Sequence, residues 1–227
     1  MKLLALETAA EACSVALSID GEIHLRYEVR PRGHSELVLA MMDELLNEAG
    51  LVPSQLDAIA FGRGPGSFTG VRIATGVVQG VAFAADLPVV PVSTLAALAQ
   101  RACRESGAKR LLPAFDARMG EVYWAAYHLG AVGLVELEGV EAVAKAEEVN
   151  LPDGDGWYGV GTGWAVYGEL LAERMGAGLE QQMPDLYCSA EDVALLGVAG
   201  FKAGNSVAPE LALPIYLRDR VAKKKSA

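Results

Sequence analysis

Short apolar runs bounded by turn residues open the chain and predict β-strands. Five such runs fall in the first hundred residues, at 2–7, 12–19, 22–29, 56–61 and 89–92. The pair Asp20-Gly21, between the second run and the third, is typical of a hairpin turn. The run at 56–61 is apolar and bounded by a glycine, which indicates a buried strand of a mostly parallel sheet.

Helical periodicity fills the gaps between these runs. It predicts helices over residues 35–49, 69–85 and 93–105. In the first helix the apolar residues form two adjacent rows at i, i+4 spacing, Leu37-Met41-Leu45 and Val38-Met42-Leu46. This stripe is wider than one core contact needs. The order β-β-β-α-β-α-β-α predicts a sheet covered by helices.

The opening pattern returns after Gly107. Glu7 and Asp116 each end an apolar run, a polar turn follows, and a second apolar run returns. Further strands are predicted near 133–137 and over 157–160, and further helices over 142–149, 165–175 and 189–203. We therefore predict an α/β protein with an internal duplication. Its two domains would be residues 1–107 and a smaller domain of residues 108–227, with a basic tail from about residue 218.

A glycine-rich loop over residues 62–70 joins a predicted strand to the helix that follows. Its glycines allow close backbone approach, Ser67 or Thr69 is suited to cap the helix, and the free N–H groups of a helix start favour an anion. A P-loop is excluded because Val71, not lysine, follows Gly70. The dinucleotide pattern lacks its third glycine at Ser67, and Asp86 precedes the next strand instead of following it. Anion binding and close packing both remain as interpretations.

The helix over 69–85 is apolar on almost every side and carries Gly76, Gly80 and Ala84 four residues apart. Because glycine costs about 1 kcal/mol inside a helix, this repeat indicates that another backbone approaches closely. The sequence leaves open whether that backbone belongs to the same chain or to another.

Composition predicts a soluble globular protein. Hydrophobic residues make up 52% of the chain and the mean hydropathy is +0.26, and we expect its apolar runs to fall short of the roughly 18 residues of a membrane span. No signal-peptide pattern is visible at the start, so we expect no membrane association. Three widely separated cysteines fit a reducing cytoplasm and argue against disulfides or zinc.

Charge and histidine placement limit the chemistry further. A net charge of −10 disfavours direct contact with nucleic-acid phosphates, and the basic cluster Lys223-Lys224-Lys225 is typical of a solvated tail. The histidines are as scattered as the cysteines, so no metal site is predicted. His34 heads the first long helix without a partner at readable spacing, which favours a surface or interface residue over a ligand or base.

Duplicated strand-turn-strand units with acids at the turns resemble the ribonuclease H-like superfamily of actin, hexokinase and Hsp70, the ASKHA fold. More specific segments resemble the TsaB (YeaZ) family. They are residues 4–8, 11–17, 34–36, 64–73, 116–123 and 214–218, of which the loop Gly-Pro-Gly-Ser-Phe-Thr-Gly at 64–70 is the most specific. The resemblance runs from the first strand to the carboxyl end.

This resemblance implies two tandem ASKHA-like domains, each a mixed sheet with flanking helices. It implies a non-catalytic partner of the paralogue TsaD, the transferase that forms N6-threonylcarbamoyladenosine beside the tRNA anticodon. The ATPase TsaE would join the complex, tRNA would be reached only through it, and the chain alone would be a cytoplasmic homodimer. TsaD-like proteins carry a His-x-x-x-His metal pair after the next strand, whereas residues 92–98 contain no histidine.

The resemblance also suggests two sets of site residues, and no catalytic or metal-binding residue. A vestigial nucleotide site would use Thr8, Asp116, Gly161 and Gly163; the alternative is turn chemistry retained from an ancestor. No cofactor would be tightly bound, although ATP or ADP would fit a joint interface with the partner. The partner surface would use residues of the first two long helices, namely His34, Leu37, Val38, Met41, Met42, Leu45, Arg72, Gly76 and Gly80. A charge at Met42 or Gly76 would then abolish pairing and leave the monomer folded.

Two alternative functions stay open. An ATP-dependent small-molecule kinase of the same superfamily would need a catalytic Asp in the cleft and tight binding of magnesium–ATP. A dinucleotide-binding protein would need the missing acid and the third glycine of its loop.

Overall fold

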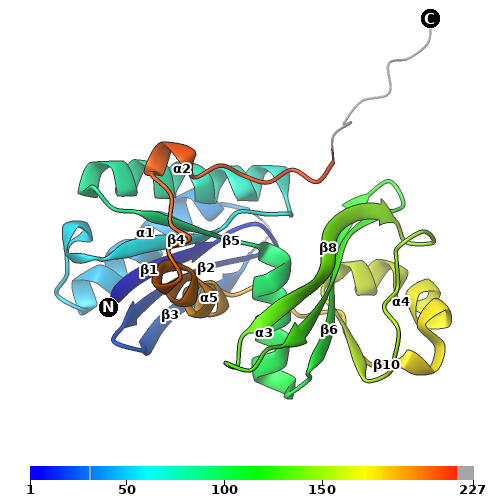
Figure 1. Ribbon diagram of the computed structural model, residues 1–227. Helices are drawn as coiled ribbons and strands as arrows, with labels where there is room; N and C mark the ends of the chain where they lie inside the picture. The colour runs from blue at the N-terminus through cyan, green and yellow to red at the C-terminus, as the bar shows by residue number, and fades with distance from the viewer. Residues whose placement is uncertain (31, 219–227) are drawn as a thin grey trace, which may run out of the picture.

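The computed structural model of the protein describes residues 1–30 and 32–218, and the predicted basic tail beyond Arg218 lies outside them. Two five-stranded sheets, each mixed, form the frame, and helices flank both (Figure 1). The strand orders are β3-β2-β1-β4-β5 and β10-β9-β6-β7-β8. This α/β arrangement is consistent with an actin-like or ribonuclease H-like fold.

The first sheet follows the predicted strands closely. Its strands are β1 (Lys2–Glu7), β2 (Ala12–Ile19), β3 (Glu22–Val29), β4 (Ala58–Gly62) and β5 (Val89–Val92). β1, β2 and β3 form an antiparallel meander, and β4 and β5 continue the sheet parallel to β1. A short 3₁₀ turn, η1 (Pro53–Gln55), leads into β4.

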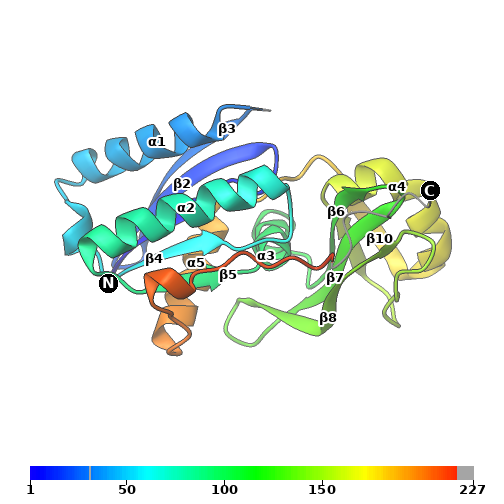
Figure 2. The same cartoon turned by 90° about the horizontal axis from the view of Figure 1, so that it is seen from above.

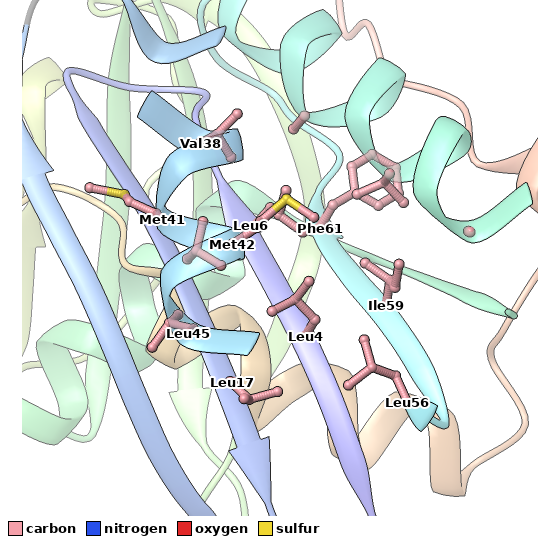
Figure 3. Packing of buried hydrophobic residues seen from close by; sticks show 14 of the residues in the cluster. Leu4, Leu6, Leu17, Val38, Met41, Met42, Leu45, Leu56, Ile59 and Phe61 are labelled. Atoms are coloured by element: carbon pink, nitrogen blue, oxygen red, sulfur yellow. The ribbon is translucent and has the colours of Figure 1, made fainter. Parts of the chain in front are cut away.

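The two faces of this sheet bury different residues. Leu4 and Leu6 of β1 face α1 (His34–Glu48) and α2 (Phe68–Ala85), whose apolar rows complete that core (Figure 3). Leu3 and Ala5 face the opposite way, toward the late helix α5 (Ala190–Lys202). Alternate residues of one strand thus enter separate cores, as the period of a β-strand requires.

The second sheet contains two features that the sequence did not predict. Its strands are β6 (Arg110–Arg118), β7 (Glu121–Leu129), β8 (Val135–Lys145), β9 (Trp157–Val160) and β10 (Leu179–Met183). The predicted helix over 142–149 is wrong, because β8 pairs with β7 as far as Lys145 and absorbs an irregularity near Gly139, whose φ is +83°. The edge strand β10 was missed because its central residues are polar and exposed.

Two helices, one from each half of the chain, pack on the sheet of the other half. α3 (Thr94–Ser106) packs on the second sheet, where Leu95 and Leu98 meet Leu111 and Phe115. α5 packs on β1, β2, β4 and β5 of the first sheet. α3 and α5 therefore pack largely across the predicted division at residue 107, on the sheet of the other half. α4 (Thr162–Met175) covers the remaining face of the second sheet and is followed by η2 (Gly176–Gly178).

The chain returns across the first sheet at its end. After α5, a 3₁₀ turn η3 (Pro209–Leu211) lies against α2, and residues 212–218 then run from the first half to the second (Figures 1 and 2). We call residues 212–218 the C-terminal strap.

Among the described residues, one helix is long and apolar enough to cross a membrane by length and composition alone. This is α2, with a mean hydropathy of 1.3 over its 18 residues, so the expectation that every apolar run falls short of a span is wrong there. Core helices of soluble proteins meet the same criterion, and α2 packs Ala74, Val78 and Ala82 into the first core.

Candidate functional site

The glycine loop closes the turn that follows β1. Thr8 is fully buried, and its hydroxyl donates a hydrogen bond to the carbonyl oxygen of Gly70 (2.7 Å). A Cβ atom on Gly70 would lie 2.0 Å from the carbonyl oxygen of Thr8, and one on Gly66 would lie 2.6 Å from that of Ala9. The Ser67 N–H donates to the same Ala9 oxygen (2.7 Å). These glycines therefore serve close packing, one of the two roles that their chemistry allows.

Glu7, the acid that ends β1, is enclosed by this turn. Its Oε1 accepts a hydrogen bond from the Ala9 N–H (2.6 Å), whereas Oε2 has no partner among the described residues and lies against Gly62, where a Cβ would be 1.9 Å away. Burial raises the pKa of Glu7 from 4.5 to about 7, against the lowering effect of the Ala9 and Thr8 backbone hydrogen bonds. The carboxyl group is thus a buried structural group, not one that faces a ligand.

A cleft of about 740 Å³ lies between the two halves of the molecule. Its walls come from the turn after β1, the starts of α1, α2 and α4, the end of β6, β7, and Arg218 of the strap. Its charged and hydroxyl-bearing lining residues are Glu11, Arg32, Ser35, Ser67, Thr69, Asp116, Arg118, Tyr123, Thr162 and Arg218.

Most of the charges in the cleft are paired. Arg118 Nη1 lies 3.1 Å from Asp116 Oδ2, and the Arg118 N–H donates to Asp116 Oδ1 (2.9 Å). Arg218 pairs with Glu121. At the start of α2, the Ser67 hydroxyl oxygen accepts the N–H of Gly70 (3.4 Å) as the helix cap. The cleft can therefore hold a polar or anionic group, but the pairing leaves little net charge to attract one.

The residues predicted for a vestigial nucleotide site do not come together. Asp116 lines the cleft, but Thr8 is buried under the glycine loop. Gly161 and Gly163 pack on β6, where a Cβ on either one would lie 2.7 Å from an atom of Ala114. Thr162 between them does line the cleft, and its hydroxyl oxygen accepts the Asp116 N–H (3.3 Å). Packing requirements thus explain both glycines.

The residues also argue against the two alternative functions. Asp116, the cleft acid that a kinase would use, is held by Arg118. Ser67, at the position of the third glycine in a dinucleotide loop, caps α2 with its side chain. Within residues 1–30 and 32–218, no group of three His, Cys, Asp or Glu side chains is placed to hold a metal ion.

The predicted partner surface is wrong for most of its α1 residues. The side chains of five residues are buried, four of them in the core between α1 and the first sheet (Figure 3); they are His34, Val38, Met41, Met42 and Leu45. The His34 ring instead bonds through Nε2 to the Arg30 carbonyl oxygen (2.6 Å). Leu37 is only half-buried. The expectation that a charge at Met42 leaves the monomer folded is wrong for the same reason, since that charge would enter the core.

The helix α2 has a row of solvent-exposed residues. Phe68, Arg72, Gly76, Gly80 and Phe83 form one exposed row along it, which we call the α2 ridge. Among residues 1–30 and 32–218, nothing lies within 4 Å of a Cβ built on Gly76 or on Gly80. No neighbour within this part of the chain therefore explains the glycine repeat at these two positions.

Three exposed aromatic residues near this ridge were missed in the sequence. Phe68 and Phe83 are 58% and 80% exposed, and Tyr216 of the strap is 46% exposed. The two phenylalanines extend the row of Arg72, Gly76 and Gly80, so helical periodicity could have identified them. Nothing in the sequence places Tyr216 beside α2, because 130 or more residues separate them.

Comparisons with known proteins agree on the family. The model of the TsaD family, described as tRNA N6-adenosine threonylcarbamoyltransferase, matches residues 27–226. The tRNA threonylcarbamoyladenosine biosynthesis protein TsaB of Escherichia coli (strain K12) is 45% identical over 229 residues, which cover 99% of this chain and 98% of that protein. Its counterpart in Haemophilus influenzae is 38% identical, with 99% of this chain and 97% of that protein covered.

Solved structures agree with the sequence matches. YeaZ from Pseudomonas aeruginosa is 51% identical and superposes with a TM-score of 0.88, covering 95% of this chain and 99% of that one. A crystal structure of a protein with similarity to peptidase YEAZ, also from Pseudomonas aeruginosa, has a TM-score of 0.89 at 51% identity and covers 96% of this chain and 99% of that one. These matches span nearly the whole molecule, and the chain belongs to the TsaB (YeaZ) family.

Proposed function

We propose that this protein acts in the biosynthesis of tRNA threonylcarbamoyladenosine, as a non-catalytic partner of a TsaD-type transferase. The names of its relatives support the pathway. The open α2 ridge supports the partner role and is the observation that carries the proposal. The transferase would form N6-threonylcarbamoyladenosine on the tRNA adenosine next to the anticodon.

The ridge has the properties of a helix-docking surface. Gly76 and Gly80 lie inside an 18-residue helix, and no neighbour in the part of the chain that the structure describes requires a glycine at either position. A glycine in a helix interior costs about 1 kcal/mol relative to alanine, so the absence of side chains there needs a reason outside this fold. Small residues let a second helix approach closely, and the exposed Phe68 and Phe83 frame the gap.

The remaining features of the proposal follow from the family. The two sheets with their helices would be tandem ASKHA-like halves. A TsaE-type ATPase would join the complex, ATP or ADP would bind at the joint interface, and tRNA would be met only through the assembly. The chain alone would form a homodimer in the cytoplasm. Its charge of −10 supports indirect contact with tRNA.

The substitution Gly76→Leu tests the partner role. The new side chain projects into open space, so the monomer keeps its stability, while a docked helix has no room for it. With the purified TsaD-type paralogue of the same organism, we expect affinity measured by calorimetry to fall about 30-fold or more, since about 2 to 4 kcal/mol is typical of a central interface position. Formation of the modified nucleoside in the reconstituted system should fall with it.

Glu169→Leu on the exposed side of α4 is the matched control, because it adds the same side chain to a helix far from the ridge. It should bind like the wild type. If Gly76→Leu also binds like the wild type, the proposed partner surface is wrong.

A further inference from the structure

We propose that the C-terminal strap is part of the partner surface, and that Arg218 is the positioning residue that holds it there. This inference rests on the proposed function. The occupant is the TsaD-type paralogue, and the contact joins the strap to the α2 ridge. The second sheet thereby takes part in docking, although no strand of it belongs to the ridge.

The strap adds an aromatic ring to the end of the ridge. The Tyr216 and Phe68 rings are 5.9 Å apart between centroids, with 35° between their planes. Arg72 lies between them: its guanidinium carbon is 3.4 Å from the Phe68 centroid and 5.5 Å from the Tyr216 centroid. All three side chains stay exposed. Arginine and aromatic residues in such a cluster are the types that dominate interface energies.

Contacts on both sides of Tyr216 fix its place. On the α2 side, Ala212 is fully buried and its carbonyl oxygen accepts a hydrogen bond from Gln79 Nε2 (3.2 Å), while the Ile215 N–H donates to the Arg63 oxygen (2.8 Å). On the other side, Arg218 Nη2 donates to the Ala117 carbonyl oxygen at the end of β6 (2.8 Å) and pairs with Glu121. The strap therefore lies stretched between the two sheets (Figure 2).

The chemistry of this surface defines the segment that fits it. Arg72 is the sole charge among the five residues of the ridge, and its exposed side chain lies beside the rings of Phe68 and Tyr216. A guanidinium placed in this way favours a carboxylate in the docked segment. We therefore expect the paralogue to offer an uncharged helix face that crosses at Gly76 and Gly80, with one Asp or Glu at the end that meets Arg72.

The first test removes the Tyr216 ring. Tyr216→Ala should weaken binding of the paralogue about 30-fold in calorimetry, the loss typical of an interface aromatic of about 2 kcal/mol. Tyr216→Phe keeps the ring and should bind within about threefold of the wild type. Both variants should unfold at the wild-type temperature. Wild-type affinity of Tyr216→Ala overturns the proposal; so does a change confined to self-association, which would place the strap between copies of this chain.

The second test asks whether Arg218 acts through Tyr216. Arg218→Ala should weaken binding about fivefold in the wild-type background and cause no further loss in a Tyr216→Ala background, because the two substitutions remove one contact. Additive losses would assign Arg218 an independent effect and overturn its positioning role. If Gly76→Leu loses binding while Tyr216→Ala and Arg218→Ala bind normally, the role of the strap is refuted and the proposed function is not. Normal binding of Gly76→Leu refutes the proposed function itself.

Discussion

The two strand-turn-strand units share one sequence pattern and have opposite surroundings. In the unit of β1 and β2, Glu7 and Thr8 are fully buried. In the unit of β6 and β7, Asp116 lines the cleft and the Arg118 side chain that pairs with it is 85% exposed. The difference lies in what covers these residues: the glycine loop and the start of α2 enclose Glu7 and Thr8, whereas Asp116 lies at the cleft.

This contrast shows that an acid at a strand end does not define a ligand site. Gly66 and Gly70 bring the loop backbone onto residues 8 and 9, which leaves no space for a ligand beside Glu7. In the second unit Asp116 lies at the cleft, but its carboxylate forms an ion pair with Arg118. A metal–nucleotide site requires neighbouring carboxylates that are free to bind the metal, and neither turn retains them.

The largest expected effect comes from forcing the closed turn open. In Gly70→Ala the new Cβ would lie 2.0 Å from the Thr8 carbonyl oxygen, a backbone atom that can move only with the turn. We expect a loss of about 3 kcal/mol or more in the free energy of unfolding, measured by urea titration.

Gly76→Ala in the same helix is the matched control for this loss. With nothing within 4 Å of the new Cβ, it should gain about 1 kcal/mol from helix propensity. Equal effects of the two alanines would mean that the contact between loop and turn is not what closes the first unit.

Buried Glu7 should make the stability of the protein depend on pH. The folded-state pKa of Glu7 is about 7 and its ordinary value is 4.5, so between these pH values the folded state binds more protons than the unfolded state. Stability contributed by the protonated group is complete below pH 4.5, falls as the pH rises to about 7, and is then constant. The expected fall is about 3 kcal/mol.

Glu7→Gln isolates this effect, because glutamine does not titrate. Its unfolding free energy, measured by urea titration at several pH values, should fall less than that of the wild type between pH 4.5 and about 7. Asp192 adds a slope of the same sign in both proteins, since burial raises its pKa to about 6 against the lowering effect of its contacts with Arg104. Parallel pH profiles for wild type and Glu7→Gln would show that Glu7 is not enclosed.

The sequence predicted the strands of the first sheet well, because each is short, apolar and bounded by a turn. It failed where tertiary contacts override local pattern. Residues 142–145 have helical composition but pair with β7. α3 and α5 have ordinary amphipathic patterns, which cannot specify the sheet that each one covers.

The candidate surface was half predictable for a related reason. Periodicity identified the apolar rows of α1, but it cannot distinguish a row that faces the sheet from one that faces a partner, so Val38 and Met42 were misassigned. Gly76 and Gly80 were identified because a glycine inside a helix lowers the stability of the helix, so two of them in one helix need an explanation. Tyr216 depends on the path of the strap, which no local pattern encodes.

The smallest expected effect concerns the open turn. Asp116→Asn removes the charge that pairs with Arg118 but keeps an oxygen for the Arg118 N–H, and an ion pair whose arginine is 85% exposed contributes little. We expect a loss below about 0.5 kcal/mol in urea titration and unchanged binding of the paralogue. Calorimetry with magnesium–ATP, with and without the paralogue, supplies the decisive reading. If the asparagine variant loses nucleotide binding that the wild type shows, the open turn carries ligand chemistry after all. If both proteins behave alike, Asp116 is a turn residue, and the two units differ only in what covers them.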